Sequence, residues 1–175
     1  VSRARFVSRS AGCIAGVPAV RAVLEMVCSS EALSFESESR DGSMVQAGDL
    51  VLAVTGPTRG LLTAERTALN LLCHLSGIAT ATHRWTTELS GTKAKVRDTR
   101  KTLPGLRTLQ KYAVRCGGGV NHRMSLGDAA LVKDNHVVAA GGVAEAFARV
   151  KAANPSIPVE VEDRKSTRLN SSHIT

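Results

Sequence analysis

Apolar residues follow two different periods along the first part of the chain. In residues 19–27 they recur every three or four positions, which predicts an amphipathic helix just after a proline. Residues 50–54 form a continuous apolar run that ends at a Gly-Pro pair, which is typical of a buried strand. Residues 1–10 predict an edge strand, whereas the mostly polar residues 29–43 are expected to face water as a strand or loop.

The longest helical pattern spans residues 62–89. Thr63 is expected to cap its N-terminus, and Glu65 suits the positive end of the helix dipole. One face of this helix is apolar and consists of Leu69, Leu72, Leu75 and Ala79. Gly77 interrupts the pattern at a cost of about 1 kcal/mol relative to alanine, so we expect a close packing contact or a break there.

Strand and helix patterns alternate through the second half of the chain. Residues 95–98, 129–133 and 157–162 predict short strands. One helical pattern opens at Pro104 and ends at Gly117, and a second ends at an Asn-Pro pair. The positions expected to face inward are Leu106, Leu109, Tyr112, Ala113 and Cys116 in the first helix and Val143, Ala146, Phe147 and Val150 in the second. This alternation predicts a parallel α/β arrangement, and an α/β barrel with active residues at the C-terminal ends of its strands is consistent with it.

The composition favours a basic globular chain that attracts anions. Hydrophobic residues make up 43% of the 175 residues, but aromatic residues only 3%, so the core must rest on Ala, Val and Leu. The net charge of +8 implies attraction to phosphates, carboxylates or nucleic acid. Nucleic-acid binding is disfavoured, because no aromatic residues are interleaved with the Lys and Arg residues for base stacking.

The four cysteines predict a reducing compartment. None of them has CxxC spacing, and most lie among apolar or small residues, so we expect reduced thiols in or near the core of a cytoplasmic protein. No apolar run approaches the roughly 18 residues that span a membrane, and the first residues lack the apolar core of a signal peptide.

Cationic side chains gather in residues 96–136, next to turn residues and short apolar runs. These side chains are Arg97, Arg100, Lys101, His122, Arg123 and Lys133. Cations gathered at strand ends predict a small ligand with several negative charges. A solvated basic face is the alternative, but Arg123 and Lys133 adjoin apolar runs, which a solvated face does not need.

Four segments in this order resemble the signature segments of the quinolinate phosphoribosyltransferase family. They are ERTALNLLCHLSGIAT at 65–80, DTRKT at 98–102, GGGVNHR at 117–123 and LVKDNH at 131–136. The resemblance covers residues 11–162 and departs at Ser125, where the family commonly has glycine.

The resemblance implies an α/β fold of the type II phosphoribosyltransferases. Residues 1–60 would form an N-terminal α/β sandwich domain, 61–92 a long connecting helix region, and 93–162 the first part of an incomplete parallel α/β barrel. Residues 163–175 have no apolar period and are interpreted as a non-native tail joined to a truncated sequence.

The resemblance also implies a reaction, in which quinolinate and phosphoribosyl pyrophosphate give nicotinate mononucleotide, pyrophosphate and carbon dioxide with substrate-bound Mg²⁺. The residues that would surround the two carboxylates of quinolinate are Arg66, Arg100, His122, Arg123 and Lys133. Lys101 would bind the phosphates of the other substrate, with Lys133 as a shared residue and Thr99 in the same substrate-binding set. Glu162 would stabilise positive charge on the ribose, with Glu160 as the fallback, so that Lys101, Lys133 and Glu162 form the catalytic set.

The matching arginine of the family, Arg66 here, reaches the partner subunit's active site, which implies a homodimer. An unclosed barrel exposes sheet edges and apolar faces, so the isolated chain is expected to be unstable or aggregated and to show no turnover. Two alternatives remain open: a related transferase with another anionic acceptor, such as the molybdenum-operon paralogues, and a non-catalytic basic binding module.

Several polar residues near the signature segments are expected to be structural. Asp98 would cap a turn or hold Arg100, His136 has no derived role in binding, and His74 would pack within its helix. The glycines at 117–119 are expected to allow a close approach of the backbone rather than to hold a phosphate.

Overall fold

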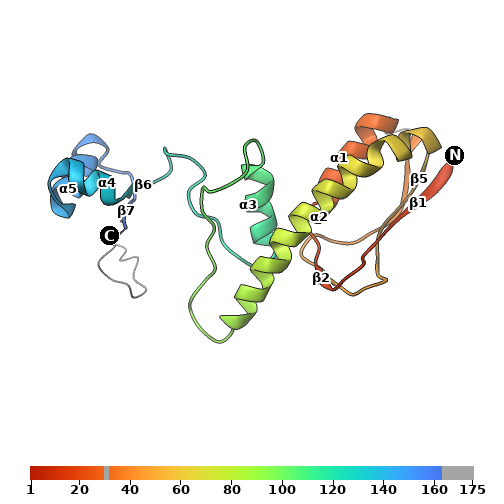
Figure 1. Ribbon diagram of the computed structural model, residues 1–175, viewed down its shortest axis with the longest axis horizontal. Helices are drawn as coiled ribbons and strands as arrows, with labels where there is room; N and C mark the ends of the chain where they lie inside the picture. The colour runs from red at the N-terminus through yellow and green to blue at the C-terminus, as the bar shows by residue number, and fades with distance from the viewer. Residues whose placement is uncertain (30–31, 163–175) are drawn as a thin grey trace. The chain divides into compact units, whose positions relative to one another are not determined.

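The computed structural model describes residues 1–29 and 32–162, so the expected non-native tail lies outside the described residues. The chain forms two compact units, residues 1–122 and the unit that begins at Arg123 (Figure 1).

The first unit begins with a small antiparallel sheet. Its strands β1 (Ser2–Val7), β5 (Leu50–Gly56) and β3 (Ser34–Glu38) lie in the order β1-β5-β3, with both neighbours antiparallel to the central β5. A second pair consists of β2 (Gly12–Cys13) and β4 (Met44–Val45). The edge strand, the buried strand and the water-facing strand predicted from the sequence are therefore confirmed.

Two helices complete the core of this sheet. Helix α1 (Val17–Cys28) and helix α2 (Thr58–Glu88) lie side by side (Figure 1), and both share one apolar cluster with the strands. Buried residues from all these elements meet in the cluster, among them Phe6, Val20, Leu24, Val54 and Leu72. The amphipathic helix predicted after the proline is confirmed, and Pro18 lies in its first turn, where the missing N–H costs no hydrogen bond.

Helix α2 differs from the prediction at its start and at Gly77. It begins one turn earlier, after Pro57, whose fixed φ suits the entry, and Thr63 instead donates a hydrogen bond to the Arg59 carbonyl inside the helix. The helix runs unbroken through Gly77, and a Cβ added there would meet nothing within 4 Å. Both expectations for Gly77 are wrong, because the burial of Leu72, Leu75 and Ala79 on the opposite face outweighs one weak helix former.

Helix α3 (Arg107–Cys116) packs against the second half of α2. It begins at Arg107 rather than at Pro104, because a turn closed by the Leu106 N–H on the Leu103 carbonyl comes first. It ends at Gly117 as predicted. Its buried residues are Gln110, Lys111 and Ala113, whereas the apolar positions expected to face inward are only partly buried apart from Ala113.

The glycines after α3 are packed against α2. A Cβ on Gly117 would lie 2.7 Å from the Thr82 Cβ, and one on Gly119 would lie 2.8 Å from the Thr82 Cγ2. The predicted close approach of the backbone is confirmed.

The predicted strand at residues 95–98 is wrong as a strand. Only Arg97 pairs, in a single parallel bridge with Val120. The pairing cannot extend, because the glycines before Val120 are docked on α2 and the chain after it turns to bond with the Asp98 side chain.

The second unit is a small parallel α/β fold. Strands β6 (Ala130–Val132) and β7 (Val159–Val161) are parallel, and α4 (Asp134–Ala140) and α5 (Val143–Ala153) connect them. Val132, Ala146, Val159 and Val161 form its core. Both strands, α5 and the parallel arrangement were predicted, whereas α4 was not. None of the described helices is long and apolar enough to cross a membrane.

Candidate active site

Two signature segments of the first unit are held together by a buried carboxylate. The Asp98 side chain, 7% exposed, accepts hydrogen bonds from the Lys111 ammonium, from the His122 N–H at 2.7 Å and from the Asn121 amide at 2.6 Å. Lys111, 2% exposed, also donates to the His122 carbonyl at 3.0 Å. We call this group of four residues, Asp98, Lys111, Asn121 and the backbone of His122, the Asp98–Lys111 hub.

The hub corrects one expectation and adds one residue that was not predicted. Asp98 was expected to cap a turn or to hold Arg100, but its ion-pair partner is Lys111. Lys111 was missed, and no pattern in the sequence marks it, because lysine is almost never fully buried unless it is paired. The position becomes visible only when α3 is packed against the loop that carries His122.

The three residues that follow Asp98 form a short turn at the surface of the first unit. The Thr99 hydroxyl accepts a hydrogen bond from the Lys101 N–H at 3.1 Å, which fixes the backbone of the turn. The Lys101 side chain is exposed, and Arg100 is half-buried. The Nε of Arg100 is buried with no hydrogen-bond partner among the described residues, so one donor of this guanidinium is unsatisfied.

Arg66 and His122 are placed differently from each other. His122 is half-buried, and both of its backbone groups are held by the hub, so its position relative to Asp98 is fixed. Arg66 is exposed on α2 and makes no hydrogen bond or ion pair within residues 1–29 and 32–162. The structure therefore brings the Arg100 and His122 segments together through the hub, whereas Arg66 lies on α2 and is not one of the residues of the hub.

The second unit brings together two other predicted residues. Lys133 follows β6 and Glu162 follows β7, and their charged groups lie 3.7 Å apart. They meet because the strands are parallel, so that both side chains leave the same edge of the sheet. The pair is about half exposed, with relative exposures of 44% and 51%, and so remains accessible to a ligand.

Other residues of the second unit have structural contacts. Arg123 donates from Nη1 to the Ala129 carbonyl at 2.7 Å, which closes the loop before β6. His136 accepts a hydrogen bond from the Lys133 N–H at 2.9 Å and so caps α4, which confirms its structural interpretation. Glu160 lies within β7 and is half-buried. No three His, Cys, Asp or Glu side chains in the described part of the chain are arranged to hold a metal ion.

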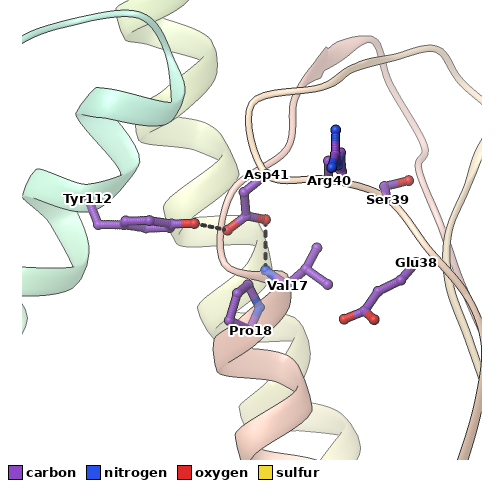
Figure 2. A pocket seen from close by; sticks show the side chains of 7 residues that line it. All are labelled: Val17, Pro18, Glu38, Ser39, Arg40, Asp41 and Tyr112. Carbon is purple, nitrogen blue, oxygen red and sulfur yellow. Dashed lines mark hydrogen bonds between the residues drawn. The ribbon is translucent and has the colours of Figure 1, made fainter.

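A cleft of about 580 Å³ in the first unit lies beside the start of α1 (Figure 2). It is lined by Val17, Pro18, Glu38, Ser39, Arg40, Asp41 and Tyr112. Asp41 accepts hydrogen bonds from the Gly16 and Val17 N–H groups at 2.8 and 3.0 Å and from the Tyr112 hydroxyl at 2.8 Å. The cleft contains none of the predicted site residues, and its central carboxylate is already occupied as the cap of α1.

Three weakly acidic groups near Asp41, the phenol of Tyr112 and the thiols of Cys13 and Cys116, have raised pKa values. Burial, and then the hydrogen bond to Asp41, raise the pKa of Tyr112 well above its ordinary value of 10.0. Burial likewise raises the pKa of Cys13 and of Cys116 above 9.0, and the Cys13 thiol lies 3.5 Å from the Cys116 carbonyl oxygen. All four cysteines are free, as predicted, although Cys73 is exposed rather than near the core.

Comparisons with protein families match both parts of the chain. Residues 1–76 match the quinolinate phosphoribosyl transferase N-terminal domain, and residues 78–172 match the C-terminal domain of the same family. A nicotinate-nucleotide pyrophosphorylase (carboxylating) from Mycobacterium leprae is 57% identical over 157 residues, which are 90% of this chain and 55% of that protein. A probable enzyme of the same name from Bacillus subtilis is 40% identical over 95% of this chain and 57% of its own length.

Solved structures agree with the family match. The crystal structure of NadC from Streptococcus pyogenes is 43% identical and superposes with a TM-score of 0.87 over 92% of this chain and 58% of that one. The nicotinate-nucleotide pyrophosphorylase of Francisella tularensis is 40% identical, with a TM-score of 0.86 over 93% of this chain and 57% of that one. The chain thus spans a little over half the length of these relatives. On the two domain matches and the shared α/β fold, the chain belongs to the quinolinate phosphoribosyltransferase family.

Proposed function

We propose that this chain supplies the quinolinate-binding part of a quinolinate phosphoribosyltransferase. The observation that carries the proposal is the unsatisfied Nε of Arg100, which lies in the segment that the hub holds next to His122. A carboxylate can accept two parallel hydrogen bonds from a guanidinium, one from Nε–H and one from an Nη–H, and the unpartnered Nε supplies one of these donors. The name of the family that matches both parts of the chain makes quinolinate the favoured carboxylate.

In the proposed reaction, the ring nitrogen of quinolinate bonds to C1 of phosphoribosyl pyrophosphate, and the C1–oxygen bond to pyrophosphate breaks. The 2-carboxylate then leaves as carbon dioxide, and the electron pair left on ring carbon 2 takes up a proton. The products are nicotinate mononucleotide, pyrophosphate and carbon dioxide. The protein needs no nucleophile for these steps, since positioning and electrostatic stabilisation carry them.

The roles of the charged residues follow from their chemistry. Arg66, Arg100, His122 and Arg123 would bind the two carboxylates, and the exposed Lys101 would bind phosphate oxygens. Lys133 and Glu162, already 3.7 Å apart, would separate on binding, with the ammonium taken by substrate anions. Glu162 would then face the positive charge that develops on the ribose.

The magnesium ion would come with the substrate. Mg²⁺ is commonly held by one or two carboxylates together with phosphate oxygens, and Glu162 is a half-exposed carboxylate that fits this arrangement. When bound, the ion would neutralise charge on the departing pyrophosphate.

Arg66 is proposed to act across a homodimer interface. Its exposure on α2, with no partner among the described residues, leaves its guanidinium available to a second subunit. The four free cysteines support a cytoplasmic location, where thiols stay reduced.

The first test is binding of quinolinate and of nicotinate to the full 175-residue chain by isothermal titration calorimetry. Arg100→Met should weaken quinolinate binding by about 10- to 100-fold, the usual effect of losing a hydrogen bond to a charged group. Arg149→Met, at an exposed arginine of α5, is the matched control and should change nothing. Binding of phosphoribosyl pyrophosphate without quinolinate would favour a transferase with another acceptor, and salt-sensitive binding of nucleic acid would favour a basic binding module.

Turnover needs a longer polypeptide. The 175-residue chain alone is expected to form no nicotinate mononucleotide. A chimera, in which residues 1–162 replace the matching segment of the Mycobacterium leprae relative, should form it from both substrates with Mg²⁺. A folded chimera that neither binds quinolinate nor turns over would contradict the proposed function.

A further inference from the structure

We infer that the Asp98–Lys111 ion pair is a positioning device that selects a dicarboxylate over a monocarboxylate. The inference rests on the proposed function and assigns a role to two residues that are not expected to touch the substrate. Both side chains are almost completely buried, with exposures of 7% for Asp98 and 2% for Lys111. They therefore act through the residues that they hold by hydrogen bonds and through the neighbours of those residues in the chain.

The ion pair joins two segments that are far apart in sequence. Asp98 directly precedes Thr99 and Arg100, and Asn121 directly precedes His122 and Arg123. The Asp98 carboxylate accepts from the Asn121 side chain and from the His122 N–H, while Lys111 donates to the His122 carbonyl. Both backbone groups of His122 are thus bound to the pair, one to each member.

This arrangement supplies something that apolar packing cannot. Replacing a buried ion pair by well-packed apolar residues is often neutral or stabilising, so stability alone does not explain why a charged pair occupies this position. Its hydrogen bonds are directional, however, and they fix the backbone of His122 relative to that of Asp98. An apolar pair would leave the His122 N–H and carbonyl without these partners.

The consequence concerns the distance between two anion-binding side chains. Arg100 lies two residues beyond Asp98, and His122 is bonded to the pair directly, so the hub sets the spacing between their side chains. A ligand with two carboxylates on neighbouring ring carbons needs both side chains at the right spacing. A ligand with one carboxylate needs only one of them, and so its binding depends less on the hub.

The test compares the affinities for quinolinate and nicotinate, which differ by the 2-carboxylate. The variant Asp98→Leu/Lys111→Met removes both charges while keeping similar volumes. The variant Asp98→Asn/Lys111→Met also removes both charges but keeps an oxygen that can accept from the His122 N–H. The control is Lys151→Met, at a lysine that donates to the carbonyls of Pro155 and Ile157 in the second unit.

We expect the preference for quinolinate, the ratio of the two dissociation constants, to fall about tenfold in the Leu/Met variant, the lower end of the effect of one hydrogen bond to a charged group. The Asn/Met variant should recover part of the preference, and the control should keep all of it. A merely structural role would lower the fraction of competent protein and weaken both ligands by the same factor, leaving the ratio unchanged. Dissociation constants are measured in the full 175-residue chain and, in parallel, in the chimera, with circular dichroism to check the fold.

The outcomes separate the two proposals. If the parent protein prefers quinolinate and the Leu/Met variant keeps that preference unchanged, the positioning role is refuted while the proposed function stands. If neither the parent chain nor the chimera binds quinolinate, the proposed function is refuted and the positioning role with it. A reduced preference in the Leu/Met variant, with partial recovery in the Asn/Met variant, supports both.

Discussion

Gly117 is a position where one added methyl group should destabilise the fold, because its backbone lies directly against α2. Its φ of −78° and ψ of 5° suit any residue, so replacement by alanine brings no backbone strain. The added Cβ would instead lie 2.7 Å from the Thr82 Cβ and closer still to the Ala79 carbonyl oxygen. Both atoms belong to the buried face of α2, where Ala79 is 0% and Thr82 7% exposed, so neither can move away from the added Cβ without disturbing the core.

The magnitude follows from two opposing effects. Forcing one methyl group into a packed interface costs about 1–3 kcal/mol. Replacing glycine by alanine also lowers the conformational entropy of the unfolded chain, which stabilises the folded state by about 0.4–1 kcal/mol. Since the closest atoms lie on or next to the α2 backbone rather than at the end of a flexible side chain, we expect the upper part of the range. Gly117→Ala should therefore lower the free energy of unfolding by about 2 kcal/mol.

Gly77→Ala is the matched control, because it makes the same substitution on α2 itself. A Cβ at Gly77 would meet nothing within 4 Å, so only the gain in helix propensity of about 1 kcal/mol remains and the variant should be more stable than the parent. Urea unfolding followed by circular dichroism measures both variants. If Gly117→Ala unfolds at the same urea concentration as the parent or a higher one, α3 and α2 do not pack as closely as the structure has them. A loss of stability in Gly77→Ala would show that this face of α2 is covered by another chain.

Three further predictions concern caps and titration. Burial raises the pKa values of Cys13, Cys116 and Tyr112, so the folded state holds these protons more tightly than the unfolded state. The three protonated groups therefore stabilise the fold fully below about pH 9, and this stabilisation is lost as the pH rises through their raised pKa values. Tyr112→Phe should make urea unfolding less dependent on pH above 10.0, and an unchanged slope would contradict the assignment. Asp41→Ala removes the cap of α1 and should cost about 1–2 kcal/mol in the same assay, against no loss if the helix start is satisfied by water. His136→Ala removes the cap of α4 and should speed amide exchange at the start of that helix alone, whereas unchanged exchange would exclude the cap.

The elements that could be predicted from the sequence are those with a clear apolar period. Helix α1 and strand β5 were predicted because their apolar residues are the ones that the core buries. The parallel pairing of β6 and β7 was predicted from the alternation of strand and helix patterns, and it brings Lys133 to within 3.7 Å of Glu162. Charged residues at the ends of successive parallel strands meet because the strands point the same way.

The elements that the sequence did not reveal depend on contacts between distant segments. Helix α4 has only seven residues and none of them is buried, so its sequence has no apolar period from which a helix could be predicted. The segment at 95–98 carries apolar and polar residues like a strand, yet only Arg97 finds a partner. Helix α3 buries Lys111 and Gln110 rather than a purely apolar face. These two side chains have polar partners in the segment before the helix, the Asp98 carboxylate for Lys111 and the Leu103 N–H for Gln110.

The candidate site shows the same division between residues that face a ligand and residues that place them. Arg100 and His122 could be named from the sequence, because a multiply charged ligand demands cations and those occur in recognisable segments. Lys111 belongs to none of the segments that resemble the family, although it donates to both of the segments that contain Arg100 and His122. A ligand-facing residue is constrained by the chemistry of the ligand, whereas a positioning residue is constrained only by its neighbours in three dimensions. If the preference for a dicarboxylate depends on Lys111, then part of the specificity of this chain is determined by a residue that does not face the ligand and cannot be found by examining the residues that do.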